Sequence, residues 1–407
     1  MAATGEPRTE QRVGSDGGVP PSWQGLCVFV VPERWAVPLS EPVAGIARGL
    51  EILEVLPLDA AARTAVARRL GTSRRFPSDA GAPHTLIVAC DVPPVLDATV
   101  DTADPRVAHR IDAVANYTTK RLWAGRPPVD HVVRYTVGTD AALDMLAVFN
   151  DPTLRERVLE RVETLRDVCT IPFPVIRMLG TDSPGFRARV ALVEHPEHGR
   201  SVCKIFRPGA MTFYNRELSA RRLLADQPLV PKLLEHGPSW LLTPEYTDDG
   251  THRLRRLPGL PGMDQLRPAA TRALADFART LHDRGLFMLD LSPQNLISDP
   301  AAGLKVIDLE FAMPYADYPA PAPSADEAWT YRGLPPALVG NIDFPRLAMT
   351  RRVGNSVFHP AVAGLPFDRL VGPSRRDDDL RRFSTQLAWY VAMATAGRLH
   401  TLLRRKR

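Results

Sequence analysis

Three polar side chains in the second half of the chain have the types and spacing that chemistry on a phosphate group requires. Asp290 and Asn295 lie five residues apart in the polar loop of MLDLSPQNLI, and Asp308 follows thirteen residues later, after the apolar run LKVI. Phosphoryl transfer needs one carboxylate that orients or deprotonates the acceptor hydroxyl. It also needs an amide oxygen and a second carboxylate that hold Mg²⁺ on the phosphates. The spacing therefore predicts a site for phosphoryl transfer.

Upstream, a lysine and a glutamate are spaced so that they can meet. Lys204 lies in the otherwise apolar run SVCKIF, and Glu217 follows thirteen residues later in a helix-like segment. A lysine that contacts the α- and β-phosphates of a nucleotide must be held by a carboxylate, and this spacing lets a strand lysine reach a helix glutamate. Lysine is scarce, since only five of the 51 basic residues are lysines: Lys120, Lys204, Lys232, Lys305 and Lys406. A site that needs a compact ammonium cannot use a guanidinium, so each lysine is a candidate for such a site.

Taken in order, these segments resemble the protein-kinase-like fold over more than half of the chain. LGTDSPGFRARV is similar to the glycine-rich loop of that family, with Gly180 and Gly185 as loop glycines and Asp182 where the family has its middle glycine. CKIF resembles the strand with the phosphate-binding lysine, and NREL resembles the helix with its partner. The resemblance implies that Lys204 contacts the nucleotide and that Glu217 holds it.

The downstream segments resemble the remaining parts of a kinase site. DLSPQN is similar to the catalytic loop, and IDLE stands where the family has Asp-Phe-Gly. The resemblance implies that Asp290 is the catalytic base and that Asn295 and Asp308 bind Mg²⁺. LLTPEYTDDG is similar to the hinge, which implies that backbone groups near Glu245 and Thr247 face adenine. ATP and Mg²⁺ are therefore the expected ligands, and the expected activity is a phosphotransferase with an alcohol group as acceptor.

The chain departs from the family pattern beside the catalytic residues. Met288 and Leu289 replace the His-Arg that precedes the catalytic aspartate, and Ser292 stands where many protein kinases have a lysine. Glu310 replaces the glycine after the metal-binding aspartate. These variants look more like atypical, lipopolysaccharide, choline or aminoglycoside kinases than regulatory protein kinases. We expect a protein serine or threonine as acceptor, and two alternatives stay open: a glycan or other small molecule as acceptor, and a pseudokinase that acts as a binding scaffold.

The elements that position these residues are expected to form two domains joined by a helix. In the first domain, residues 23–150, strand-like runs alternate with helix-like stretches, which indicates an α/β or α+β layer fold. Its strands are expected at 26–31, 50–58 and 85–90, and its helices at about 41–49, 59–70, 105–123 and 140–149. Residues 151–170 carry apolar side chains at helical spacing and are expected to form a linker helix. Residues 1–22 are expected to be a disordered tail.

The second domain, residues 171–407, is expected to be α+β and bilobal, with an N-lobe at 171–247 and a C-lobe at 248–407. Two strands flank the glycine-containing turn, and a third is expected to end at Lys204. Further elements are a helix at 213–225, strands near 231–235 and 240–246, and a helix at 268–284. A strand-rich half is thus followed by a helix-rich half.

The first domain has a fainter similarity to the ferredoxin-like fold of nucleoside-diphosphate kinases. CVFVVPERWAV, LEILEVLPLDAAARTAVARRL, HTLIVAC and VGTDAALDMLAVF follow that family's order. Its His-Gly-Ser-Asp motif becomes Val137-Gly138-Thr139-Asp140, and Val31 stands in place of a lysine. The resemblance implies a binding or docking domain without phosphohistidine chemistry, and a generic α/β domain is an equal alternative.

Composition narrows the class of protein further. The net charge of +5 over 407 residues is too small for the concentrated basic face of a nucleic-acid binder. The four cysteines form no CxxC pair, which argues against a disulfide framework or a zinc site and fits a reducing cytoplasm. No apolar run approaches the roughly 20 residues that span a bilayer. His282, His359 and His400 lack the spacing of metal ligands.

Overall fold

The structure is a computed structural model, and it describes residues 25–36, 38–70, 81–92, 106–122, 132–136, 138–179, 187–252, 267–288 and 295–314. The chain divides into two compact units, of which the first takes Met1–Pro93 with Ala98–Asp167 and the second takes Pro94–Asp97 with Val168–Arg407. The predicted disordered tail and the predicted C-lobe beyond residue 314 lie outside the described residues.

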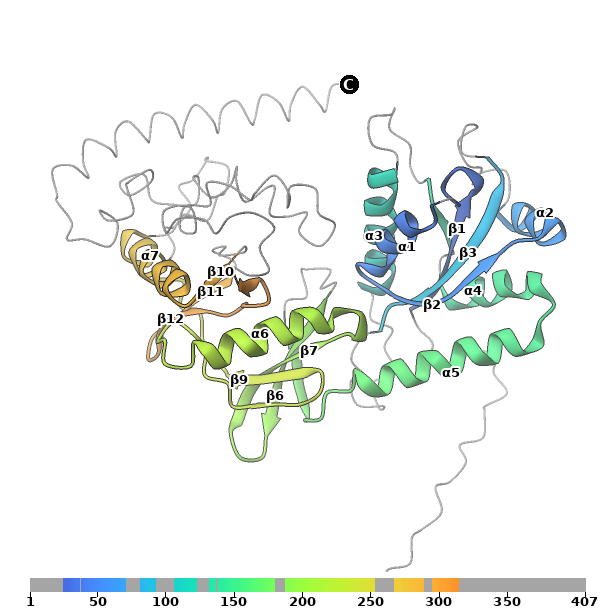
Figure 1. Cartoon of the computed structure of the whole chain (residues 1–407). Coiled ribbons are helices and arrows are strands. Elements are labelled where there is room, and N and C mark those ends of the chain that lie inside the picture. Colours follow the sequence, from blue (N-terminus) through green and yellow to red (C-terminus); the bar gives the residue numbers. More distant parts are fainter. Residues whose placement is uncertain are drawn as a thin grey trace, which may run out of the picture. The chain divides into compact units, whose positions relative to one another are not determined.

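The first unit is built on a four-stranded antiparallel sheet of strand order β2-β3-β1-β4 (Figure 1). Its strands are β1 (Leu26–Pro32), β2 (Glu51–Pro57), β3 (Pro83–Cys90) and β4 (Arg134–Tyr135). Its helices are α1 (Ser40–Ala47), α2 (Ala60–Leu70), α3 (Arg106–Leu122), α4 (Thr139–Leu146) and α5 (Pro152–Val168), with short 3-10 helices at Glu33–Trp35 and Ala147–Phe149. All of β1 is buried, as its continuous apolar run LCVFVVP predicts.

The linker helix predicted at 151–170 is α5, and its body belongs to the first unit. Leu154, Val158 and Val162 are buried along one side of this helix. The Arg161 guanidinium donates a hydrogen bond to the carbonyl of Leu53 at 2.6 Å. The boundary between the units follows Asp167, so the apolar stripe of α5 is part of the first unit's core.

The second unit begins with a five-stranded antiparallel sheet of order β5-β6-β7-β9-β8. Its strands are β5 (Val175–Leu179), β6 (Ala188–His195), β7 (Gly199–Phe206), β8 (Glu235–His236) and β9 (Trp240–Pro244). A short 3-10 helix at Pro208–Ala210 leads into helix α6 (Met211–Leu223), which packs against β7 (Figure 1). At the turn between β6 and β7, Gly199 has a φ of 62°, which glycine adopts without strain.

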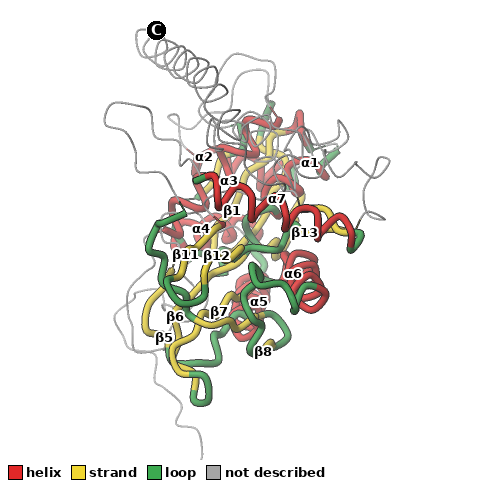
Figure 2. Tube along the Cα trace, turned by 90° about the vertical axis from the view of Figure 1, so that its left-hand side faces the viewer, coloured by secondary structure: helices red, strands yellow, loops and turns green. Residues whose placement is uncertain are grey.

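The remaining described elements of the second unit are helix α7 (Pro268–Asp283) and two strand pairs, drawn in red and yellow in Figure 2. Strand β10 (Leu286–Met288) pairs with β13 (Ala312–Pro314), and β11 (Leu296–Asp299) pairs with β12 (Gly303–Val306). One apolar core joins these elements to α6, since Leu274 and Phe277 of α7 cluster with Ala220 of α6, with Leu224 just after that helix, and with Leu309. This core fixes the segment after β12 relative to α6.

Mixed helices and antiparallel sheets confirm the α+β class, and some element ends differ from those predicted. The strand predicted to end at Lys204 continues to Phe206, because β7 stays paired with β9 as far as Ile205. The strand predicted near 231–235 is reduced to Glu235–His236, since Pro231 cannot donate to a strand ladder. Among the described helices, none combines the length and apolar character needed to cross a membrane.

Candidate functional site

Strand β7 places Lys204 on the face of the sheet that α6 covers. Lys204 pairs with Val190 of β6 and with Leu241 of β9, so it lies in the interior of the sheet. Successive side chains of a strand point to opposite faces. Cys203 and Ile205 belong to the core on one face, and Lys204 shares the other face with Phe206, whose ring packs with Tyr214 and Leu218 of α6. The ammonium lies 4.9 Å from the centre of the Phe206 ring.

The Lys204 ammonium meets three carboxylates. Its Nζ lies 2.7 Å from Oε2 of Glu217, which α6 supplies. It lies 2.9 Å from Oδ1 of Asp308 and 3.1 Å from Oε2 of Glu310, both from the segment after β12. Glu217 is fully buried and Glu310 is 3% exposed, whereas Asp308 is 25% exposed and is therefore the carboxylate that a ligand can reach.

Two arginines form ion pairs with the two buried carboxylates of this cluster, Glu217 and Glu310. Arg221, one turn after Glu217 on α6, donates to Oε1 of Glu217 at 3.0 and 2.6 Å and also to the carbonyls of Pro231 and Ile307. Nε of Arg187 donates to Oε1 of Glu310 at 2.5 Å. The cluster thus balances three cations, Lys204, Arg187 and Arg221, with three carboxylates.

The charges shift the pKa values of the central groups in different directions. Burial alone would lower the pKa of Lys204, but Asp308, Glu217 and Glu310 outweigh it and raise that pKa well above its usual value. Burial works against ionisation of Asp308, yet the charge and hydrogen bond of Lys204 hold its pKa below the usual value. Burial and the charge of Asp308 raise the pKa of Glu310. Lys204 is therefore a permanent cation at this site.

The structure brings together three of the predicted site residues, Lys204, Glu217 and Asp308. The backbone of Asn295 lies next to that of Asp308, because the Asn295 carbonyl accepts the N–H of Ile307, the residue before Asp308, at 2.9 Å. The predicted base and the predicted loop glycines lie outside the described residues: Asp290, Gly180 and Gly185.

The backbone predicted to face adenine has other partners. The N–H of Thr247 donates to Oδ2 of Asp299 at 2.8 Å, so an adenine that bound this N–H would have to displace a carboxylate. The side chain of Glu245 forms an ion pair with Arg200 at 2.8 Å. The Thr247 N–H is thus occupied by Asp299, 52 residues away in sequence, and the expectation that backbone groups near Glu245 and Thr247 face adenine stays a prediction.

Sequence reasoning missed the supporting residues Glu310, Arg187 and Arg221. Arg221 could have been predicted, since residues four apart on a helix are neighbours and Glu217 needs a cation when buried. Glu310 stands where the protein-kinase-like pattern has a glycine, and a side chain two residues after Asp308 can return to the same site. The pattern around Arg187 carries no signal of its own.

The donor chemistry of the cluster fits a magnesium ion. Oxygen atoms of Glu217, Asp308 and Glu310 lie within 4.8 Å of one another, and carboxylate oxygens are the ligands that Mg²⁺ prefers. Both oxygens of Glu217 and both oxygens of Glu310 are already engaged by lysine or arginine, so Asp308, which contacts Lys204 through Oδ1, is the residue of this cluster with acceptor capacity for a cation.

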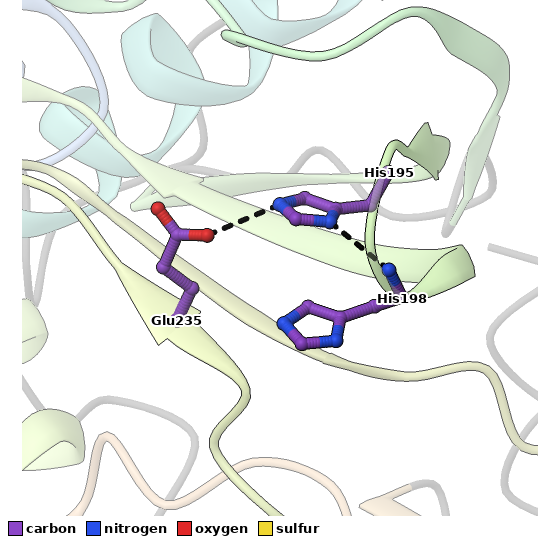
Figure 3. Close-up of side chains that lie close together, drawn as sticks. All are labelled: His195, His198 and Glu235. Carbon is purple, nitrogen blue, oxygen red and sulfur yellow. Dashed lines mark hydrogen bonds and ion pairs between the residues drawn. The ribbon is translucent and has the colours of Figure 1, made fainter.

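A second group of possible ligands combines two histidines at the turn between β6 and β7 with a glutamate of β8. Figure 3 shows His195, His198 and Glu235, whose ligand atoms also lie within 4.8 Å of one another. Nδ1 of His195 accepts the N–H groups of Glu197 and His198, which leaves the ring proton on Nε2, 3.1 Å from Oε2 of Glu235. A cation on Nε2 would have to replace that proton while Nδ1 still accepted two N–H groups. The arrangement therefore stabilises the turn and is a poor metal centre.

No protein-family model matches this sequence, and no curated protein is similar to it.

Proposed function

We propose that the second unit is an ATP- and Mg²⁺-dependent phosphotransferase that transfers a γ-phosphoryl group to a hydroxyl, that of a protein serine or threonine. The observation that carries the proposal is the meeting of Lys204 with Glu217, 13 residues later, at 2.7 Å and with Asp308, 104 residues later, at 2.9 Å. A five-stranded sheet with one helix after its third strand, which places a glutamate on a strand lysine, is also what a kinase-like N-lobe would supply.

Each residue of the cluster has a task that follows from its position. Lys204 donates to α- and β-phosphate oxygens, and Glu217 keeps its ammonium in place because Arg221 holds the glutamate from the other side. Asp308, the most exposed of the three carboxylates, binds the metal together with Asn295. Mg²⁺, when bound, neutralises the charge that develops on the transferred phosphoryl group. Asp290 orients the acceptor hydroxyl, and most of the rate comes from positioning and electrostatic stabilisation.

The test is turnover of ATP by the full chain and its variants. Purified protein with γ-labelled ATP and Mg²⁺ is assayed against protein acceptors, and separately against a panel of glycans and small hydroxyl compounds. We expect Asp290→Ala to abolish transfer while nucleotide affinity is nearly kept, and Asp308→Ala to abolish both. Glu194→Gln is the control, because Glu194 is an exposed side chain of the same sheet. Unchanged turnover in Asp290→Ala or Asp308→Ala contradicts the assignment.

One observation favours a second candidate, a pseudokinase that binds partners without turnover. The carboxylate of Glu310 contacts the Lys204 ammonium at 3.1 Å, where a phosphate would have to bind. Binding of Mg²⁺ and ATP with no transfer to any acceptor in the same assay would select this alternative.

For the first unit we infer a ferredoxin-like domain with a binding or docking role. In its strand order β2-β3-β1-β4, β3 separates β1 from β2, and this split arrangement characterises the β-α-β-β-α-β fold. Helix α4 starts at Thr139, directly after Gly138, where the related motif would follow its histidine, and residue 137 here is valine. The full chain should therefore not pass phosphate between nucleoside triphosphates and diphosphates, and such a transfer would contradict the inference.

The four cysteines bear on the compartment that we propose. All four are buried, and none forms a disulfide in the structure: Cys27, Cys90, Cys169 and Cys203. Cysteines stay reduced in a reducing compartment, which supports a cytoplasmic site for the reaction.

A further inference from the structure

The Lys204 ammonium has no hydrogen left for a nucleotide. An ammonium group has three N–H donors. In the structure they point to three carboxylates, at 2.7 Å for Glu217, 2.9 Å for Asp308 and 3.1 Å for Glu310. A phosphate oxygen can therefore bind Lys204 only after one carboxylate has moved away.

The three carboxylates differ in how firmly they are held at Lys204. Glu217 is fixed, since it is fully buried and its second oxygen accepts two hydrogen bonds from Arg221. Asp308 is the proposed metal ligand and is needed when the nucleotide is bound. Glu310 makes the longest of the three contacts, and its second oxygen already accepts from Arg187. Glu310 is therefore the carboxylate that can leave.

The charges of the cluster point to the same residue. Lys204, Arg187 and Arg221 balance three carboxylates, so the cluster is neutral before any nucleotide binds. A nucleoside triphosphate with one Mg²⁺ still carries a net negative charge, and that charge would repel every carboxylate near Lys204. Moving Glu310 toward Arg187 relieves that repulsion without leaving a buried charge unpaired.

We propose that Glu310 is a gate, which in its closed position occupies Lys204 in place of a phosphate and in its open position is held by Arg187 alone. The inference rests on the proposed function, because it assigns regulation to the same lysine. It also explains why a glutamate can follow Asp308 where the resembling family has glycine: the side chain is an autoinhibitory contact that nucleotide binding must break.

Arg187 is placed to receive the released carboxylate. Its guanidinium lies 4.7 Å from the centre of the Phe311 ring and 5.1 Å from that of Phe213, and stacking on two rings fixes its plane. The planar fork of an arginine can hold both oxygens of one carboxylate. Rotation of the Glu310 side chain can thus exchange the contact with Lys204 for a second contact with Arg187.

The test is the dissociation constant of Mg²⁺-ATP for the full chain, measured by calorimetry. Glu310→Gln keeps the size of the side chain and removes its charge, so the constant should fall toward the value of the open state. If the open state is about one tenth of the population, binding tightens about 10-fold. Glu310→Ala, which removes the side chain beyond Cβ, should show the same gain, and Glu194→Gln should show none. Affinity that is unchanged or weaker in both Glu310 variants, each shown to be folded by thermal unfolding, overturns the gate.

Arg187→Ala tests whether Arg187 receives the released Glu310 carboxylate or binds a phosphate directly. As a receiver, Arg187 matters only while Glu310 is charged, so its replacement should weaken binding in the wild-type chain and have no effect in the Glu310→Gln chain. Equal weakening in both chains overturns the receiver role. If neither the wild-type chain nor the two Glu310 variants bind nucleotide, or if their binding does not depend on Lys204, the proposed function is overturned together with the gate. Binding that depends on Lys204 but is not tightened by either Glu310 variant overturns the gate alone.

Discussion

Glu217 is the residue whose replacement should destabilise the second unit most clearly. Glu217→Ala leaves the buried Arg221 without its carboxylate and takes one of three partners from Lys204. Breaking a buried ion pair on one side costs about 3–5 kcal/mol. Because Lys204 keeps Asp308 and Glu310, and Arg221 keeps the carbonyls of Pro231 and Ile307, we expect the lower end of that range, about 3 kcal/mol.

The loss can be measured by urea unfolding of the full chain. Two compact units can unfold in separate transitions, so the data need a fit to two steps rather than one. Only the transition of the second unit should move, and a loss of about 3 kcal/mol corresponds to about a 100-fold change in its unfolding equilibrium constant. Asn215→Ala is the matched control, since Asn215 is exposed on the same helix and its replacement should change stability by less than about 0.5 kcal/mol.

Glu217→Gln separates charge from shape. It keeps the volume of the side chain and offers Lys204 or Arg221 an amide oxygen, so its loss should be smaller than that of Glu217→Ala. A loss below about 1 kcal/mol in Glu217→Ala, no larger than that of a typical surface pair, would refute the view that this glutamate organises the buried cluster.

Three further predictions concern other parts of the chain. Arg284 lowers the pKa of Asp226 from 3.8 to about 2, so this ion pair stabilises the fold above pH 4, and the stabilisation is lost as the pH falls through about 2. Asp226→Asn should therefore make the stability less dependent on pH between these two values, and an unchanged pH dependence contradicts this. Burial raises the pKa of Cys203 to about 12, so iodoacetamide at pH 8 should alkylate it only when urea unfolds the second unit, as mass spectrometry of the peptides can show. In the first unit, a Cβ at Gly45 would lie 2.7 Å from the Thr118 hydroxyl, so Gly45→Ala should cost about 1–3 kcal/mol in thermal unfolding, and a neutral result would mean that α1 can shift away from α3.

The meeting of Lys204, Glu217 and Asp308 could be predicted because each residue lies in an element with a strong local pattern. The apolar run SVCKIF predicts a buried strand, and NRELSARRLL predicts a helix soon after it. The short connection between the two brings Glu217 over Lys204. Asp308 follows a second apolar strand, and Val306 at the end of that strand and Leu309 directly after Asp308 enter the core that also contains Ala220 of α6. Periodicity and short connections carry this information.

The contacts that sequence reasoning missed depend on residues far apart in the chain. Arg187 reaches Glu310 across 123 positions, and Asp299 takes the N–H of Thr247 across 52. No local pattern encodes such pairs, because they follow from the way in which the core around α6 and α7 places the later strands. The same holds for α5, whose amphipathic pattern indicates a helix but does not identify the unit that covers its apolar stripe.

Lys204 is the residue proposed to bind the phosphates of a nucleotide. The most direct measurement is calorimetric titration of Mg²⁺-ATP into the full chain and into Lys204→Met, which keeps the length of the side chain. Loss of a charge-assisted hydrogen bond costs about 1.5–3 kcal/mol, so affinity should fall at least about 10-fold. Lys232→Met, at an exposed lysine of the same unit, should bind as wild type does. Equal affinity in Lys204→Met and Lys232→Met, or no Mg²⁺-dependent binding by the wild-type chain, would contradict the claim.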